Sequence, residues 1–98
     1  MSDCTAGPSD VLDEARTLTS GDRNAQYGPP DQDFARTAKM WGAYLGVDIR
    51  PSDVAWMMVM LKASRNRHQR KRDNYVDAIG YVRCGAMCAG FDPWEKRE

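Results

Sequence analysis

The chain has 98 residues, 42% of them hydrophobic, and its 14 basic residues balance its 14 acidic ones. A chain of this length is expected to form one domain with a modest core, because a small domain buries a smaller share of its surface. The zero net charge provides no overall field that would favour nucleic acid or an anionic membrane. No run of about 18 apolar residues is present to span a bilayer, and the first residues lack a signal-peptide pattern, so we expect a cytoplasmic protein.

The spacing of the apolar residues predicts an all-α domain of four helices over residues 9–90, between a disordered leader at 1–8 and a C-terminal tail at 91–98. The helices are expected at residues 9–20, 31–45, 51–66 and 72–89. Gly46 and Gly90 are expected to end the second and fourth helices, and Pro51 to begin the third.

The third helix contains the longest apolar run of the chain, from Val54 to Leu61. Such a run covers every side of a helix, which is more than one small monomer can bury. We therefore expect a homodimer or homotetramer, with part of this run at a subunit interface.

The fourth helix has two stripes. Its apolar stripe consists of Tyr75, Ile79, Val82 and Ala86. The opposite stripe joins two aspartates to small residues such as Gly80 and Cys84. We expect both stripes to be partly buried and the acidic one to line a pocket.

The strongest candidate site is the hairpin between the third and fourth helices. Asp73 and Asp77 lie four residues apart, a spacing at which like charges repel on a helix, so a cation or a polar ligand is expected beside them. Lys62 and Arg65 lie near the end of the third helix, and a short turn between antiparallel helices brings them close to these aspartates. The cluster either fixes the hairpin through structural ion pairs or binds a phosphorylated ligand, with the basic side chains on phosphate and the aspartates on magnesium or on ligand hydroxyls.

The loop at residues 21–30 has turn-forming residues at both ends and a polar, aromatic centre. Arg23 is suited to grip a phosphate with two hydrogen bonds, and Tyr27 is suited to stack on a base. A capped, well-packed turn explains the loop equally well. The basic run at residues 65–72 has no interleaved aromatic residues, so a solvated turn that steers a ligand is favoured there over nucleic-acid binding.

Several motifs follow one another at consistent spacing from residue 9 to about residue 85. They are Gly21-Asp22-Arg23 with Tyr27-Gly28-Pro29, then Phe34-Ala35-Arg36-Thr37-Ala38 with Trp41, then Leu61-Lys62-x-Ser64-Arg65, and lastly Lys71-Arg72-Asp73-Asn74-x-x-Asp77 with Gly80-Tyr81. Together they resemble a family of small bacteriophage proteins known as MazG-like.

The resemblance implies a four-helix MazG-like bundle of the all-α nucleoside triphosphate pyrophosphohydrolase superfamily. Enzymes of that superfamily form dimers or tetramers and cleave a nucleoside triphosphate to the monophosphate and pyrophosphate. The resemblance also implies Mg²⁺ at acidic residues, here Asp73 and Asp77, which would be the catalytic residues. Taken together, the loop, the hairpin and these motifs predict the ligand-binding residues Arg23, Tyr27, Lys62, Arg65, Arg72, Asn74 and Tyr81.

Where the superfamily has its first acidic cluster, the third helix has Met57, Met58, Leu61 and Lys62, none of which binds magnesium. The sequence therefore leaves two functions open: a metal-dependent pyrophosphohydrolase, or a non-catalytic binder that sequesters a host nucleotide immune signal. A third interpretation is an interaction module for nucleic acid or a host protein that uses the basic turn. If a phage encodes the protein, it would act in the host cytoplasm.

Overall fold

The computed structural model describes residues 10–20 and 30–92, which form helices and contain no strand. The helices are α1 (Val11–Leu18), α3 (Pro30–Leu45), α4 (Pro51–His68) and α5 (Arg72–Cys88). The all-α prediction is confirmed for these residues, and the helix ends agree with the predicted ones within two residues. The leader, residues 21–29 and the tail beyond residue 92 lie outside the described residues.

Local sequence explains where the helices begin and end. The Asp10 side chain caps α1 by accepting a 2.8 Å hydrogen bond from the backbone N–H of Asp13. Pro51 occupies the start of α4, as predicted. Gly46 follows α3 with φ 72° and Gly90 follows α5 with φ 86°, and both values lie in the left-handed region that glycine adopts without strain.

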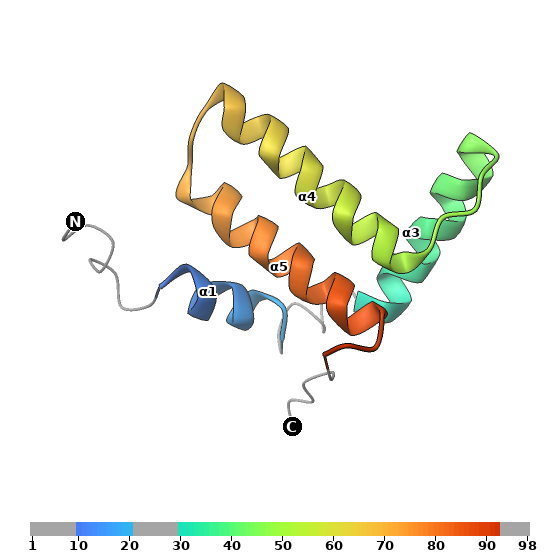
Figure 1. Cartoon of the computed structure of the whole chain (residues 1–98), viewed down its shortest axis with the longest axis horizontal. Helices are drawn as coiled ribbons and strands as arrows, with labels where there is room; N and C mark the ends of the chain where they lie inside the picture. Colours follow the sequence, from blue (N-terminus) through green and yellow to red (C-terminus); the bar gives the residue numbers. More distant parts are fainter. Residues whose placement is uncertain (1–9, 21–29, 93–98) are drawn as a thin grey trace.

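The helices are arranged around an antiparallel hairpin of α4 and α5 (Figure 1). α1 lies along α5 on the side away from α4, and α3 meets the hairpin at the end opposite the α4–α5 turn. The turn end of the hairpin is therefore free of α3. The described helices thus form a layer of α1, α5 and α4, and α3 lies across one end of it.

The core lies where α3 meets the hairpin. It consists of the buried residues Phe34, Ala38, Val54, Ala55 and Cys84, with Trp41, Ile49, Met58, Tyr81 and Cys88 packed against it. The two hairpin helices, α4 and α5, approach closely there. A Cβ added to Gly85 would lie only 2.8 Å from the Cβ of Ala55. Glycine at this position lets the helices pack at short range.

Polar side chains of α5 hold α1 in place. The guanidinium of Arg72 donates two hydrogen bonds, of 2.7 and 2.9 Å, to the carboxylate of Glu14. Nη1 of Arg83 donates to the hydroxyls of Thr19, at 2.8 Å, and Ser20, at 3.2 Å. These contacts fix the middle and the C-terminal end of α1 on α5.

The two stripes of α5 differ more than the sequence suggested. Gly80 and Cys84 of the acidic stripe are buried, whereas Tyr75 and Val82 of the apolar stripe are exposed. The expectation that the apolar stripe is partly buried is therefore wrong at these two positions, whereas Ile79 and Ala86 of the same stripe are half-buried. None of the helices in the described ranges is long and apolar enough to cross a membrane.

Candidate functional site

The site is built on the α4–α5 turn, which two asparagines lock. Nδ2 of the buried Asn74 donates to Oδ1 of Asn66 at 3.1 Å and to the carbonyl oxygen of Gln69 at 3.3 Å. The same Oδ1 of Asn66 accepts from the backbone N–H of Lys71 at 3.2 Å. A buried amide that bonds both helices and the turn fixes how the side chains around it are presented.

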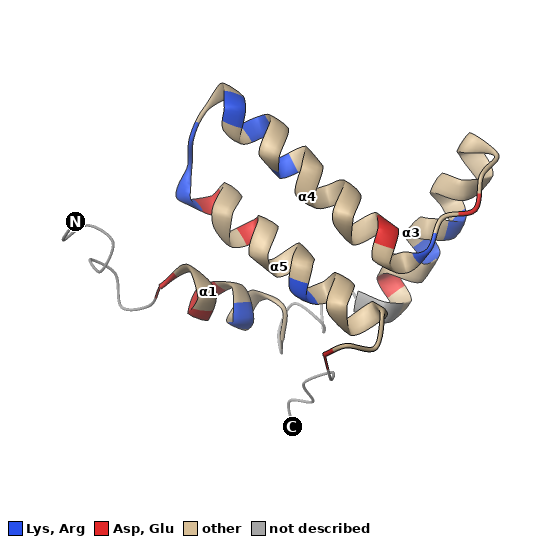
Figure 2. Cartoon of the chain, viewed as in Figure 1, with Lys and Arg blue, Asp and Glu red and all other residues tan. Residues whose placement is uncertain are grey.

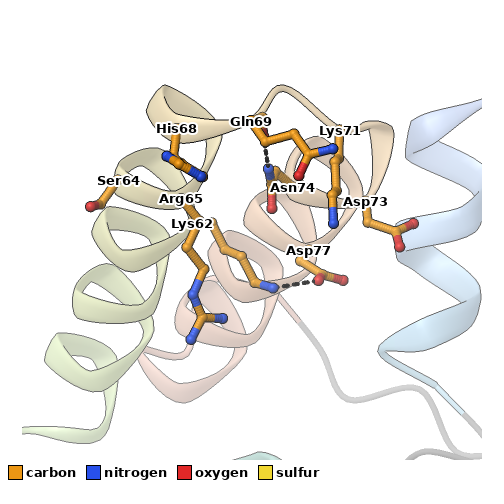
Figure 3. Close-up of a pocket in the computed structure, with 9 residues that line it drawn as sticks. All are labelled: Lys62, Ser64, Arg65, His68, Gln69, Lys71, Asp73, Asn74 and Asp77. Carbon is orange, nitrogen blue, oxygen red and sulfur yellow. Dashed lines mark hydrogen bonds and ion pairs between the residues drawn. The ribbon is translucent and has the colours of Figure 1, made fainter.

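A hollow of about 570 Å³ lies beside this turn, and we call it the hairpin hollow (Figure 3). Its size falls within the range of small-molecule sites, which is roughly 300–1,000 Å³. Each residue that lines it has a charged or polar side chain. The lining residues are Lys62, Ser64, Arg65, His68, Gln69, Lys71, Asp73, Asn74 and Asp77.

The predicted approach of Lys62 to the acidic pair is confirmed for Asp77. Nζ of Lys62 lies 2.8 Å from Oδ2 of Asp77, and these side chains are 15% and 33% exposed (Figure 3). Partial burial on both sides makes the pair better defined than a surface ion pair. Lys62 therefore neutralises one of the two carboxylates of the hairpin hollow.

The other charges of the hairpin hollow are more open to solvent. Arg65, Lys71 and Asp73 are exposed, and none of them forms an ion pair with another described residue. In Figure 3 the carboxylate of Asp73 points away from Lys62. With the Lys62–Asp77 pair neutral, two cations and one carboxylate remain at this rim, so the net charge favours an anion.

The donor set fits magnesium poorly. Within residues 10–20 and 30–92, no three side chains of Asp, Glu, His or Cys gather as a metal site requires. Of the two aspartates that the sequence suggested, Asp77 is engaged by Lys62 and Asp73 is turned away from it. A hard cation such as Mg²⁺ needs several oxygen ligands arranged as an octahedron.

Two of the predicted ligand-binding residues lie elsewhere in the fold. Arg72 faces α1, where it bonds Glu14. Tyr81 packs against Phe34 beside the core, with their ring centroids 6.4 Å apart. Arg23 and Tyr27 lie outside the described residues. The structure therefore brings together Lys62, Arg65, Asn74 and the two aspartates, and does not place Arg72 or Tyr81 with them.

The sequence reasoning missed part of the site. It did not assign a role to Asn66, although an asparagine close to a predicted helix end and eight residues before another asparagine is a signal for a turn lock. Lys71 was predicted only as part of the basic, ligand-steering run at residues 65–72 and of a motif, and its place in the lining depends on the conformation of the turn.

Comparison with known proteins places the chain in a family. A model of the family described as "Domain of unknown function (DUF6378)" matches residues 10–89, a range that includes the four helices of the described residues. The chain belongs to the DUF6378 family. The matched range covers the α4–α5 turn and its asparagine lock.

Two relatives of the chain come from mycobacteriophages. The chain is 36% identical over 75 residues to the "Gene 55 protein" of Mycobacterium phage D29, a match that covers 76% of this chain and 50% of that protein. It is 38% identical over 74 residues to the "Gene 55 protein" of Mycobacterium phage L5, covering 74% of this chain and 47% of that protein. The chain thus spans about half the length of these curated relatives, and no solved structure matches it. The matches confirm the expected kinship with bacteriophage proteins.

Proposed function

We propose that this DUF6378 protein is a MazG-like nucleotide-binding protein that holds nucleotide phosphates in the hairpin hollow. One observation carries the proposal: the α4–α5 turn gathers Lys62, Arg65 and Lys71 beside a hollow of ligand size. Figure 2 shows that cationic residues follow one another along the end of α4 and into this turn.

The chemistry of the cations supports phosphate as the ligand group. The guanidinium of Arg65 offers a planar fork that matches two phosphate oxygens, and the ammonium of Lys71 adds a point charge. Ligand phosphates would replace water around both groups without breaking an ion pair, since neither is paired with a described carboxylate. Lys62 reaches the same space while it stays bonded to Asp77.

Between the two functions left open by the sequence, the Lys62–Asp77 pair favours binding without turnover. Hydrolysis in the pyrophosphohydrolase superfamily depends on carboxylates that hold a metal, which supplies charge neutralisation and an activated water when bound. In this protein the ammonium of Lys62 already pairs with the carboxylate of Asp77, at 2.8 Å. This pair therefore supports the second candidate function, a protein that sequesters a host nucleotide signal. Magnesium-dependent hydrolysis is the alternative that the experiment has to distinguish from it.

The test is equilibrium binding by calorimetry with nucleoside triphosphates, cyclic dinucleotides and ADP-ribose, each with magnesium and with a chelator. We expect at least one nucleotide to bind, and Arg65→Gln to weaken binding by about 10- to 100-fold, because a hydrogen bond to a charged group contributes about 1.5–3 kcal/mol. Arg67→Gln is the matched control, since Arg67 is exposed on α4 but does not line the hairpin hollow.

Pyrophosphate release measured on the same samples separates the two modes. Release that requires magnesium and disappears in Asp77→Asn assigns hydrolysis. Nucleotide that is bound and recovered intact assigns sequestration. No binding of any of these nucleotides, or an equal loss in Arg65→Gln and Arg67→Gln, would refute the proposed site.

A further inference from the structure

The charges that line the hairpin hollow nearly cancel. Lys62, Arg65 and Lys71 face the two carboxylates of Asp73 and Asp77. Lys62 and Asp77 pair at 2.8 Å and neutralise each other. Counted over its lysines, arginine and aspartates, the lining therefore keeps one excess positive charge, which a single negative charge on a ligand would balance.

The remaining charges of the hollow are all accessible to a ligand. Arg65, Lys71 and Asp73 are exposed, and none of them forms an ion pair with another described residue. The carboxylate of Asp73 points away from Lys62, the cation that neutralises Asp77 (Figure 3). Asp73 is therefore a carboxylate that repels each negative charge that a ligand brings to the hollow.

Nucleotides differ in the charge of their phosphate groups. A phosphodiester has one negative charge and two free oxygens. A nucleoside triphosphate has about four negative charges near neutral pH, because its terminal phosphate is a monoester with up to two. In the hairpin hollow a phosphodiester would leave no net charge, whereas a triphosphate would leave about three negative charges unbalanced.

Magnesium is the usual means of neutralising a bound triphosphate, because it bridges phosphate oxygens. In this lining Asp77 is paired with Lys62, so Asp73 is the one carboxylate left to hold such an ion. Three metal-binding side chains do not gather anywhere in the part of the chain that the structure describes. The lining therefore repels a triphosphate without offering a set of ligands for its metal.

We propose that the hairpin hollow selects nucleotides joined by a phosphodiester, and that Asp73 is the residue that disfavours triphosphates. This ligand class rests on the proposed function and narrows it. The guanidinium of Arg65 matches the two free oxygens of a diester, and Lys71 adds a second positive charge beside them. Ser64 and Gln69, uncharged polar residues of the same lining, are available to the sugar and the base.

The repulsion by Asp73 adds up over the charges of the ligand. At about 8 Å in water-like surroundings, one carboxylate weakens binding about twofold for each negative charge on the ligand. Removal of that charge should tighten a singly charged ligand about twofold. It should tighten a triphosphate about tenfold, because about four charges are affected and the outer ones lie farther away. The ratio of the two affinities therefore reports on Asp73.

The test is calorimetry with ligands that share a base and differ in their phosphates, in a chelator at about 0.15 M salt. The ligands are a linear dinucleotide with one phosphodiester, a cyclic dinucleotide and a nucleoside triphosphate, each with adenine and with guanine. In the wild type, at least one diester should bind at least 10-fold more tightly than the triphosphate of the same base. Comparison of the linear with the cyclic dinucleotide shows which form of the diester the site prefers.

Asp73→Asn should reduce this affinity ratio about fivefold, mainly by tightening the triphosphate. Asp48→Asn is the matched control, because it removes the same charge from an exposed residue between α3 and α4 that does not line the hollow. The affinity ratio of Asp48→Asn should equal that of the wild type. The wild-type ratio needs no variant, so it decides alone if Asp73→Asn does not fold.

The outcomes that overturn the ligand class differ from the one that removes the site. A triphosphate that binds as tightly as the diesters in the chelator refutes the class, while the nucleotide site stands. If Asp73→Asn weakens the triphosphate in magnesium, Asp73 holds a metal and its effect has the opposite sign. An equal change of the ratio in Asp73→Asn and Asp48→Asn means that only the net charge matters. No binding of any of these ligands removes the nucleotide site and its selectivity together.

Discussion

The close contact between α4 and α5 predicts opposite behaviour for two glycines of the same helix. In Gly85→Ala the new Cβ would lie 2.8 Å from the Cβ of Ala55, so two helix backbones would have to separate. In Gly80→Ala it would lie 3.4 Å from Cγ2 of Thr19, which is an ordinary contact. Both changes gain about 0.5–1 kcal/mol from the higher helix propensity of alanine. Overpacking costs about 1–3 kcal/mol and applies only to Gly85→Ala.

The difference between these two variants isolates the packing cost, because the propensity gain is common to both. For a domain of this size, 1 kcal/mol corresponds to about 4–8 °C in melting temperature. Gly85→Ala should therefore melt about 5 to 20 °C below Gly80→Ala when both are followed by circular dichroism at one protein concentration. Equal melting temperatures, or a more stable Gly85→Ala, would refute the close approach of the two helices.

Two further predictions concern the turn and the start of α4. Asn74→Ala should lower the unfolding free energy in urea by about 1–3 kcal/mol, because it removes two hydrogen bonds of a buried amide, each contributing about 0.5–1.5 kcal/mol. Asp73→Ala, at the exposed neighbouring residue, should change the unfolding free energy little, and equal effects of the two changes would contradict the turn lock. Hydrogen bonds from the guanidinium and the backbone N–H of Arg50 lower the pKa of Asp53 below its ordinary value of 3.8. The stabilisation from this pair is therefore present above pH 3.8 and is lost as the pH falls through the lowered pKa. Arg50→Gln should return the Asp53 midpoint, followed by carboxyl NMR, toward 3.8, and an unchanged midpoint would argue against the capping contact.

The helices and the main ion pair of the site could be predicted from local sequence. Pro51, Gly46 and Gly90 mark helix ends through backbone properties that no distant contact overrides. The Lys62–Asp77 pair follows from a short turn between two antiparallel helices. These features depend on neighbours in sequence, so periodicity and turn chemistry were sufficient.

Features that depend on packing between distant segments could not be predicted. Arg72 pairs with Glu14, 58 residues away, and only the position of α1 makes that contact possible. A helical wheel likewise shows that Tyr75 and Val82 share a side of α5, but it does not show whether another element covers that side. The role of Asn66 depends on the exact path of the turn, which helix periodicity does not contain.

The attachment of α1 has a consequence for the dynamics of the protein. α1 has only eight residues, fewer than the roughly 12–15 that an isolated helix needs to be even marginally stable in water. Its folded state therefore depends on the side chains that α5 extends to it. We expect its amide protons to exchange with solvent well before those of α4 and α5, with α1 detaching as a unit while the hairpin stays folded.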